Sequence, residues 1–171
     1  MGPGHFAIAF AAKPVAPKAP LWTLLVASET LDLLCFGCTA VGLEKFGVTQ
    51  VSIADGIKIL TPGSIPWSHG LFMSLVWSAL AAGIAYLVFR DRRTGGVLGP
   101  VVFSHWGLDF IVHLPDLPLF FDGSPKVGLG LWATGPGLMV SGVLEVALLA
   151  GGVAIYIVTR KRNDAQQVHA K

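Results

Sequence analysis

The sequence predicts an all-α integral membrane protein that folds as one polytopic helical bundle of about four transmembrane helices. Only 13% of its 171 residues are charged and 53% are hydrophobic, whereas a soluble domain carries about 25% charged residues. The hydrophobic residues gather in four stretches, each long enough to cross a hydrocarbon core of about 30 Å as a helix. We therefore expect residues 1–171 to form a single membrane domain.

Each expected span is bounded by residues that end helices. A short apolar segment at residues 4–12 comes first, and a link rich in proline and lysine follows it. A polar loop with several glycines and prolines ends the first span, an arginine-rich run ends the second, and a Pro-Asp-Leu-Pro run breaks the third. The spans are expected at about residues 21–43, 67–89, 97–114 and 129–158.

Basic residues predict the orientation of the bundle. Lysines precede the first span, arginines lie between the second and third spans, and a basic run at 160–162 follows the fourth. With four spans, all three clusters fall on one side, which the positive-inside rule assigns to the cytoplasm. Both termini are then cytoplasmic, and loops 44–66 and 115–128 lie outside. The net charge of +2 gives no indication of nucleic-acid binding.

Ionisable residues interrupt every expected span. In the third, His105, Asp109 and His113 have i, i+4, i+8 spacing, so they share one helix face. Ionisable groups are costly in lipid, so they face a bundle interior and mark a function. The other candidates are Glu29 and Asp32 on the first span, His69 at the start of the second, and Glu145 on the fourth.

This mixture of imidazole and carboxylate suits a divalent metal ion, with zinc as the first choice. Several carboxylates close together would repel each other without a cation. In a hydrolytic site one coordination position stays open for water, whose pKa the metal lowers to about 7.

Other interpretations remain open for these residues. They could form a cation or proton carrier, or paired histidines could hold haem in an electron-transfer protein. Haem does not explain the carboxylates. Histidines at helix ends and Glu145 could also be hydrogen-bonding partners without a chemical role. The Cys35-x-x-Cys38 pair is either a redox pair, as in quinone-linked enzymes, or two small residues that fill helix contacts.

The order of four motifs carries a resemblance to a known family. The motifs are Gly4-His5, Ser28-Glu29-Thr30-Leu31-Asp32, Trp67-Ser68-His69-Gly70 and His105-Trp106-Gly107-Leu108-Asp109. In this order they resemble the YdjM-like (LexA-binding) family of bacterial inner-membrane metal-dependent hydrolases. The resemblance covers about residues 4–113. The acidic motif lacks the proline of the family, and Gly70 stands where serine is usual.

The resemblance implies a hydrolase distantly similar to zinc-dependent phospholipase C. It would cleave a phosphoester or another ester at the surface of the bacterial inner membrane, with a lipid-like molecule as substrate. The implied metal ligands are His5, Glu29, Asp32, His69, His105 and Asp109, and Glu29 and Asp32 are the catalytic candidates, with Glu29 preferred as general base. His113 and Glu145 would be further ligands or would orient a ligand imidazole. His5 precedes the first span, so it reaches the site only if residues 4–12 fold back into the bundle.

Overall fold

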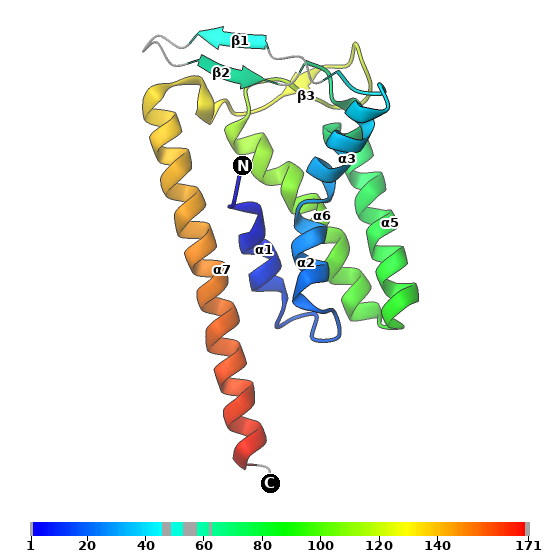
Figure 1. Cartoon of the computed structure of the whole chain (residues 1–171), viewed down its shortest axis with the longest axis vertical. Coiled ribbons are helices and arrows are strands. Elements are labelled where there is room, and N and C mark those ends of the chain that lie inside the picture. Colours follow the sequence, from blue (N-terminus) through cyan, green and yellow to red (C-terminus); the bar gives the residue numbers. More distant parts are fainter. Residues whose placement is uncertain (1, 46–48, 53–57, 62, 170–171) are drawn as a thin grey trace.

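The computed structural model describes residues 2–45, 49–52, 58–61 and 63–169, which form an elongated helical bundle (Figure 1). The predicted all-α class is confirmed, because most of the described chain is helical. The helices are α1 (His5–Ala12), α2 (Leu21–Ser28), α3 (Thr30–Ala40), α4 (Pro66–His69), α5 (Leu71–Phe89), α6 (Arg92–Val112) and α7 (Gly135–His169), with a 3-10 turn at Leu131–Ala133.

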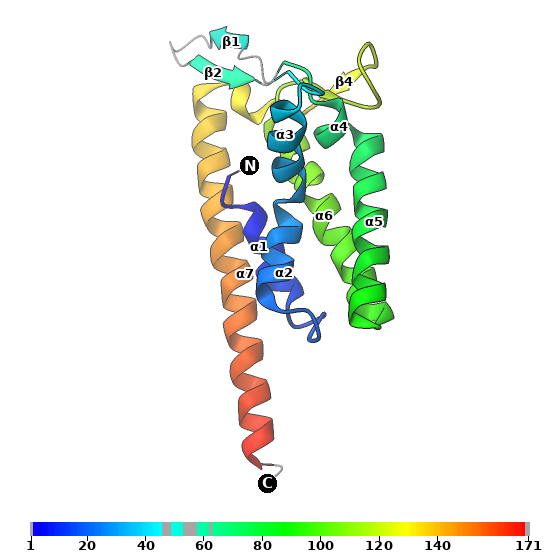
Figure 2. The same cartoon turned by 45° about the vertical axis from the view of Figure 1, so that its right-hand side comes forward.

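Two small antiparallel strand pairs cover the upper end of the bundle (Figure 2). Strands β1 (Thr49–Ser52) and β2 (Lys58–Thr61) pair with Thr49 opposite Thr61, and β3 (Leu117–Pro118) pairs with β4 (Lys126–Val127). The first pair lies within residues 44–66, where the sequence analysis expected only a loop.

Three helices of the described chain are long and apolar enough to cross a membrane: α5, α6 and α7. Helices α2 and α3 add a fourth span if they are counted as one segment, which is bent by 56°. The expected span at 21–43 is therefore a broken helix rather than a straight one. Its break lies at Glu29, whose φ of −103° and ψ of 6° depart from helical values.

Capping residues explain why α6 and α7 do not begin where the sequence analysis placed them. Helix α6 begins at Arg92 rather than at 97, because the Asp91 carboxylate accepts a hydrogen bond of 2.9 Å from the Thr94 amide. Helix α7 begins at Gly135 rather than at 129, because Thr134 Oγ1 accepts a hydrogen bond of 3.1 Å from the Gly137 amide.

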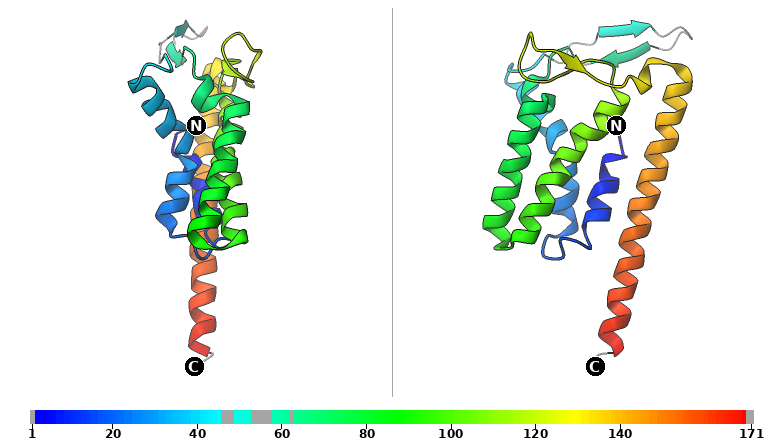
Figure 3. Two further views of the ribbon diagram at one scale, coloured as in Figure 1. Left: turned by 90° about the vertical axis from the view of Figure 1, so that its right-hand side faces the viewer. Right: turned by 180° about the vertical axis from the view of Figure 1, so that it is seen from behind.

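An ion pair joins two of the links between helices at the lower end of the bundle. Lys18, in the link between α1 and α2, lies 3.2 Å from Asp91 in the turn between α5 and α6. Hydrogen bonds from Thr94, together with the Lys18 ammonium group, hold the pKa of Asp91 below its ordinary value. The first two basic clusters of the sequence thus lie at one end, toward which the last turns of α7 also point (Figure 3).

Small residues allow α5 and α6 to pack closely. A Cβ atom added at Gly95 would lie 2.8 Å from the carbonyl oxygen of Ala82, and one at Gly99 would lie 3.1 Å from that of Ser78. This four-residue spacing of glycines is typical of close helix contacts in membranes. The contact fixes α6, which carries His105 and Asp109, against α5.

Helix α1 folds back into the bundle, as the role proposed for His5 requires. It packs against α7, α2 and α6, and its small side chains Ala7, Ala9 and Ala12 are buried. Gly152 of α7 permits this contact, since a Cβ atom there would lie 2.3 Å from the carbonyl oxygen of Ala7. The first described residues consequently lie inside the length of the bundle, beside α6 and α7 (Figure 1).

Candidate metal centre

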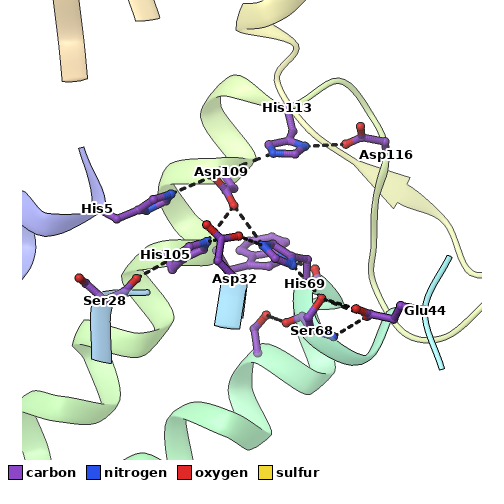
Figure 4. A network of polar contacts seen from close by, with 12 residues as sticks. His5, Ser28, Asp32, Glu44, Ser68, His69, His105, Asp109, His113 and Asp116 are labelled. Atoms are coloured by element: carbon purple, nitrogen blue, oxygen red, sulfur yellow. Dashed lines mark hydrogen bonds and ion pairs between the residues drawn. The ribbon is translucent and has the colours of Figure 1, made fainter. Parts of the chain in front are cut away.

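Side chains from four helices meet in one polar cluster (Figure 4). They are His5 of α1, Asp32 of α3, His69 of α4, and His105 and Asp109 of α6, with His113 directly after α6. The side chains of His5, His69, His105 and Asp109 are at most 4% exposed, whereas that of Asp32 is 45% exposed. The cluster is thus closed on most sides and opens beside Asp32.

Two groups of possible ligand atoms share His105: Asp32, His69 and His105 form one, and His5, His105 and Asp109 form the other, each with atoms within 4.8 Å of one another. Nε2 of His69 lies 3.3 Å from Asp32 Oδ1 and 3.5 Å from Asp109 Oδ2. Nε2 of His105 lies 3.5 Å from the same oxygen of Asp32 and 3.3 Å from that of Asp109. Zinc binds nitrogen and oxygen at about 2.0–2.1 Å, so neighbouring ligands of a tetrahedral zinc ion are about 3.3 Å apart.

The bend between α2 and α3 orients His105. Because the helix is interrupted at Glu29, the carbonyl oxygen of Ser28 lies 2.7 Å from His105 Nδ1. A carbonyl oxygen only accepts hydrogen bonds, so Nδ1 carries the proton and donates it. In the neutral ring, Nε2 then presents its lone pair toward the carboxylates of Asp32 and Asp109. A cation between these groups, either a metal ion or a proton on Nε2, stabilises lone pairs and carboxylates that face each other.

A buried relay orients His69 in the same way. Its Nδ1 lies 2.8 Å from Ser68 Oγ, and Ser68 Oγ lies 2.9 and 3.0 Å from the two carboxylate oxygens of Glu44. The serine hydroxyl donates to Glu44 and accepts from His69, which leaves Nε2 of His69 facing the cluster. The Ser68 amide also donates to Glu44 over 2.8 Å. Such outer partners fix ligand imidazoles in metal sites.

Unsatisfied polar atoms support a metal ion at this position. Within the described residues, neither ring nitrogen of His5 has a hydrogen-bond partner, and nor does Nε2 of His105. These nitrogens lie at ion-pair distance from carboxylate oxygens but without hydrogen-bond geometry. Buried polar groups are almost always paired, and cations held between these Nε2 atoms and the carboxylates would satisfy Nε2 of His5 and Nε2 of His105.

Three predicted site residues lie outside the two groups of possible ligand atoms in the described chain: Glu29, His113 and Glu145. Glu29 lies at the break between α2 and α3, with Oε1 buried and without a hydrogen-bond partner among the described residues. Glu145 lies on α7 against the start of α1, where a Cβ atom at Gly4 would meet its Cγ at 3.3 Å.

The sequence analysis missed the outer partners of the histidines, which are Glu44, Ser68 and the carbonyl group of Ser28. Glu44 was assigned to a polar loop, yet it is 3% exposed. The one feature of the sequence that could have indicated these partners is Ser68, directly before His69, because its hydroxyl can bond to the imidazole. Cys35 and Cys38 are free cysteines on α3, and Cys35 is buried, as expected of residues that fill helix contacts.

Comparison of the chain with protein-family models, with curated proteins and with solved structures finds no match. The chemical assignment of this centre therefore depends on its own residues and their geometry.

Proposed function

We propose that the protein is a membrane-embedded metal-dependent hydrolase that cleaves a phosphoester or another ester at the membrane surface, with zinc as the metal. One observation carries the proposal. Two imidazole nitrogens and two carboxylate oxygens from three helices converge at 3.3–3.5 Å, and the second nitrogen of each imidazole is held by an outer partner. The order of the motifs supports membership of the YdjM-like family as part of the same proposal.

The residues divide into ligands and a base. Asp32, His69, His105 and Asp109 would hold the ion, which when bound supplies Lewis acidity toward the ester and lowers the pKa of water. Glu29, three residues before Asp32 and half-buried at the helix break, is the carboxylate proposed to accept a proton from the attacking water. The half-exposed Asp32 marks the side from which substrate arrives.

The surroundings of Asp32 favour a lipid-like substrate. Neighbouring side chains on α3 are apolar and exposed, with Leu33 at 55% and Phe36 at 68%. In a membrane this surface faces lipid, so the opening of the centre lies beside the bilayer. We place the basic clusters on the cytoplasmic side of a bacterial inner membrane and the centre toward the outer leaflet.

The geometry disfavours a haem site. A haem held between two histidines needs a slot for its planar macrocycle. Here carboxylate oxygens lie 3.3–3.5 Å from Nε2 of both His69 and His105. The space directly in front of the two imidazoles is therefore occupied by acidic groups.

Elemental analysis and a turnover assay on detergent-purified protein test the proposal. We expect zinc or a similar ion to co-purify, His105→Ala and Asp109→Ala to deplete it, and p-nitrophenyl phosphodiesters or phospholipid vesicles to be hydrolysed. His169→Ala, at the end of α7, is the control and should keep the metal. Metal-free protein whose melting temperature is unchanged by chelation would contradict the proposal. Ion flux in vesicles without hydrolysis would indicate a carrier, and a strong Soret band would indicate haem.

A further inference from the structure

The Asp109 carboxylate faces two different sets of histidines with its two oxygens. Oδ2 lies 3.5 Å from His69 Nε2 and 3.3 Å from His105 Nε2. Oδ1 lies 3.3 Å from His5 Nε2 and 4.0 Å from His113 Nε2. The metal position proposed above uses only Oδ2, which leaves the histidines around Oδ1 without a role.

His5 is placed at Oδ1 at a considerable cost in free energy. Its side chain is 1% exposed, and neither ring nitrogen has a hydrogen-bond partner among the described residues. Burying such a group without hydrogen bonds destabilises the fold unless something else binds its nitrogens. The imidazole stacks on that of His105 with ring centroids 3.7 Å apart and planes at 3°. Stacking explains the ring's orientation, but it leaves both nitrogens unsatisfied.

His113 is oriented toward Asp109 by an outer partner of its own. Its Nδ1 lies 3.1 Å from Asp116 Oδ1, and its Nε2 faces Asp109 Oδ1 (Figure 4). A carboxylate that fixes one nitrogen of a histidine while the other nitrogen binds a metal is a common pattern around zinc. His113 caps the end of α6, where its amide donates to the Asp109 carbonyl oxygen over 2.8 Å and its carbonyl oxygen accepts from the Gly130 amide over 2.7 Å, so its backbone is fixed beside Asp109.

We propose that His5, His113 and Asp109 Oδ1 form a second divalent-metal position, so that Asp109 bridges two ions. This inference rests on the proposed metal centre and extends it from one ion to two. The distance of 3.3 Å from His5 to Asp109 already matches neighbouring zinc ligands, and the 4.0 Å from His113 to the same oxygen would shorten by a rotation of the His113 side chain on its fixed backbone. Pairs of ions about 3.5–4 Å apart serve displacement at phosphorus, where one stabilises the attacking oxygen and the other the leaving oxygen.

Metal stoichiometry distinguishes two positions from one. Purified protein equilibrated with Zn²⁺ and freed of excess metal should contain two equivalents. His5→Gln and His113→Gln should each lower this to one, because each removes a ligand of the second position only. His69→Gln should also leave one, and Asp109→Asn should lose both. His169→Gln is the matched control and should retain two. Circular dichroism and gel filtration verify the fold of each variant, and His113→Gln, outside the helix, tests the proposal if His5→Gln does not fold.

Electron paramagnetic resonance provides a readout that does not depend on activity. With Mn²⁺ in place of zinc, the wild-type protein should show exchange coupling through the bridging carboxylate. His113→Gln should show the six-line spectrum of an isolated ion. One equivalent in the wild type, whether kept or lost in His5→Gln and His113→Gln, would overturn the second position and leave the single-metal centre standing. Protein without any bound metal would overturn the whole centre.

Discussion

At the scale of single residues, a variant at Glu29 distinguishes whether this carboxylate acts as a general base or as a metal ligand. It lies at the helix break beside the centre but outside the grouped ligand atoms of the described chain. Glu29→Gln preserves size and one acceptor oxygen but takes no proton at neutral pH. We expect the variant to keep its metal and to lose turnover by about 10²–10⁴-fold, the usual contribution of a general base.

Metal analysis and a phosphodiester assay on the same preparation measure both effects. Asp164→Asn, on an exposed turn of α7, is the control and should change neither. Loss of metal together with activity would make Glu29 a ligand, and unchanged turnover would remove it from the mechanism.

The histidines and aspartates of the centre could be predicted because ionisable residues inside apolar sequence have few other uses. His105 and Asp109 share a helix face by spacing alone. The relay from Glu44 through Ser68 to His69 could not be predicted, because it depends on a loop residue brought back over 24 positions. An ionisable residue within apolar sequence does not always belong to the cluster. Glu145 has such a setting, yet it lies against the start of α1.

At the scale of elements, the contact between α1 and α7 decides whether His5 reaches the centre. Gly152→Ala would place a Cβ atom 2.3 Å from the carbonyl oxygen of Ala7, whereas Gly151→Ala meets nothing within 4 Å. Overpacking of this kind costs about 1–3 kcal/mol. We expect Gly152→Ala to melt at a lower temperature than Gly151→Ala and to release metal more readily.

Thermal unfolding in detergent, followed by circular dichroism with and without chelator, compares the two alanine variants. Both gain the same helix propensity, so their difference isolates the packing contact. Equal melting temperatures and equal metal retention would show that α1 is not held at this point.

Helices were easier to predict than the way they are interrupted. The uniformly apolar run at 67–89 correctly predicted that α5 ends at Phe89. The bend at Glu29 left no such signal, since Ser28-Glu29-Thr30 contains neither proline nor glycine. The fold-back of α1 also depends on partners more than 100 residues away, including Asp109 and Gly152.

At the scale of the whole molecule, the basic clusters predict which end lies in the cytoplasm. Strand β4 and the last turns of α7 lie at opposite ends of the bundle (Figure 2), and Lys126 in β4 and Asn163 in α7 are exposed. With Cys35 and Cys38 replaced by alanine, a membrane-impermeant maleimide applied to spheroplasts should label Lys126→Cys and spare Asn163→Cys until the membrane is broken.

The reverse labelling pattern would show that the bundle has the opposite orientation in the membrane, with the proposed centre in the inner leaflet. Labelling of both positions from the same side would contradict an odd number of crossings between them and thus the role of α7 as a span.

The return of α1 to the middle of the bundle has a consequence for biosynthesis. His5 is made well before the carboxylate it meets, which belongs to the sixth helix, 104 positions later. Helix α1 spans only eight residues, too few to cross a bilayer by itself. During insertion of the chain, α1 can take its final position only after α6 and α7 have been inserted, because these helices form the surface that it packs against. The centre is therefore complete only after α1 has packed against α6 and α7.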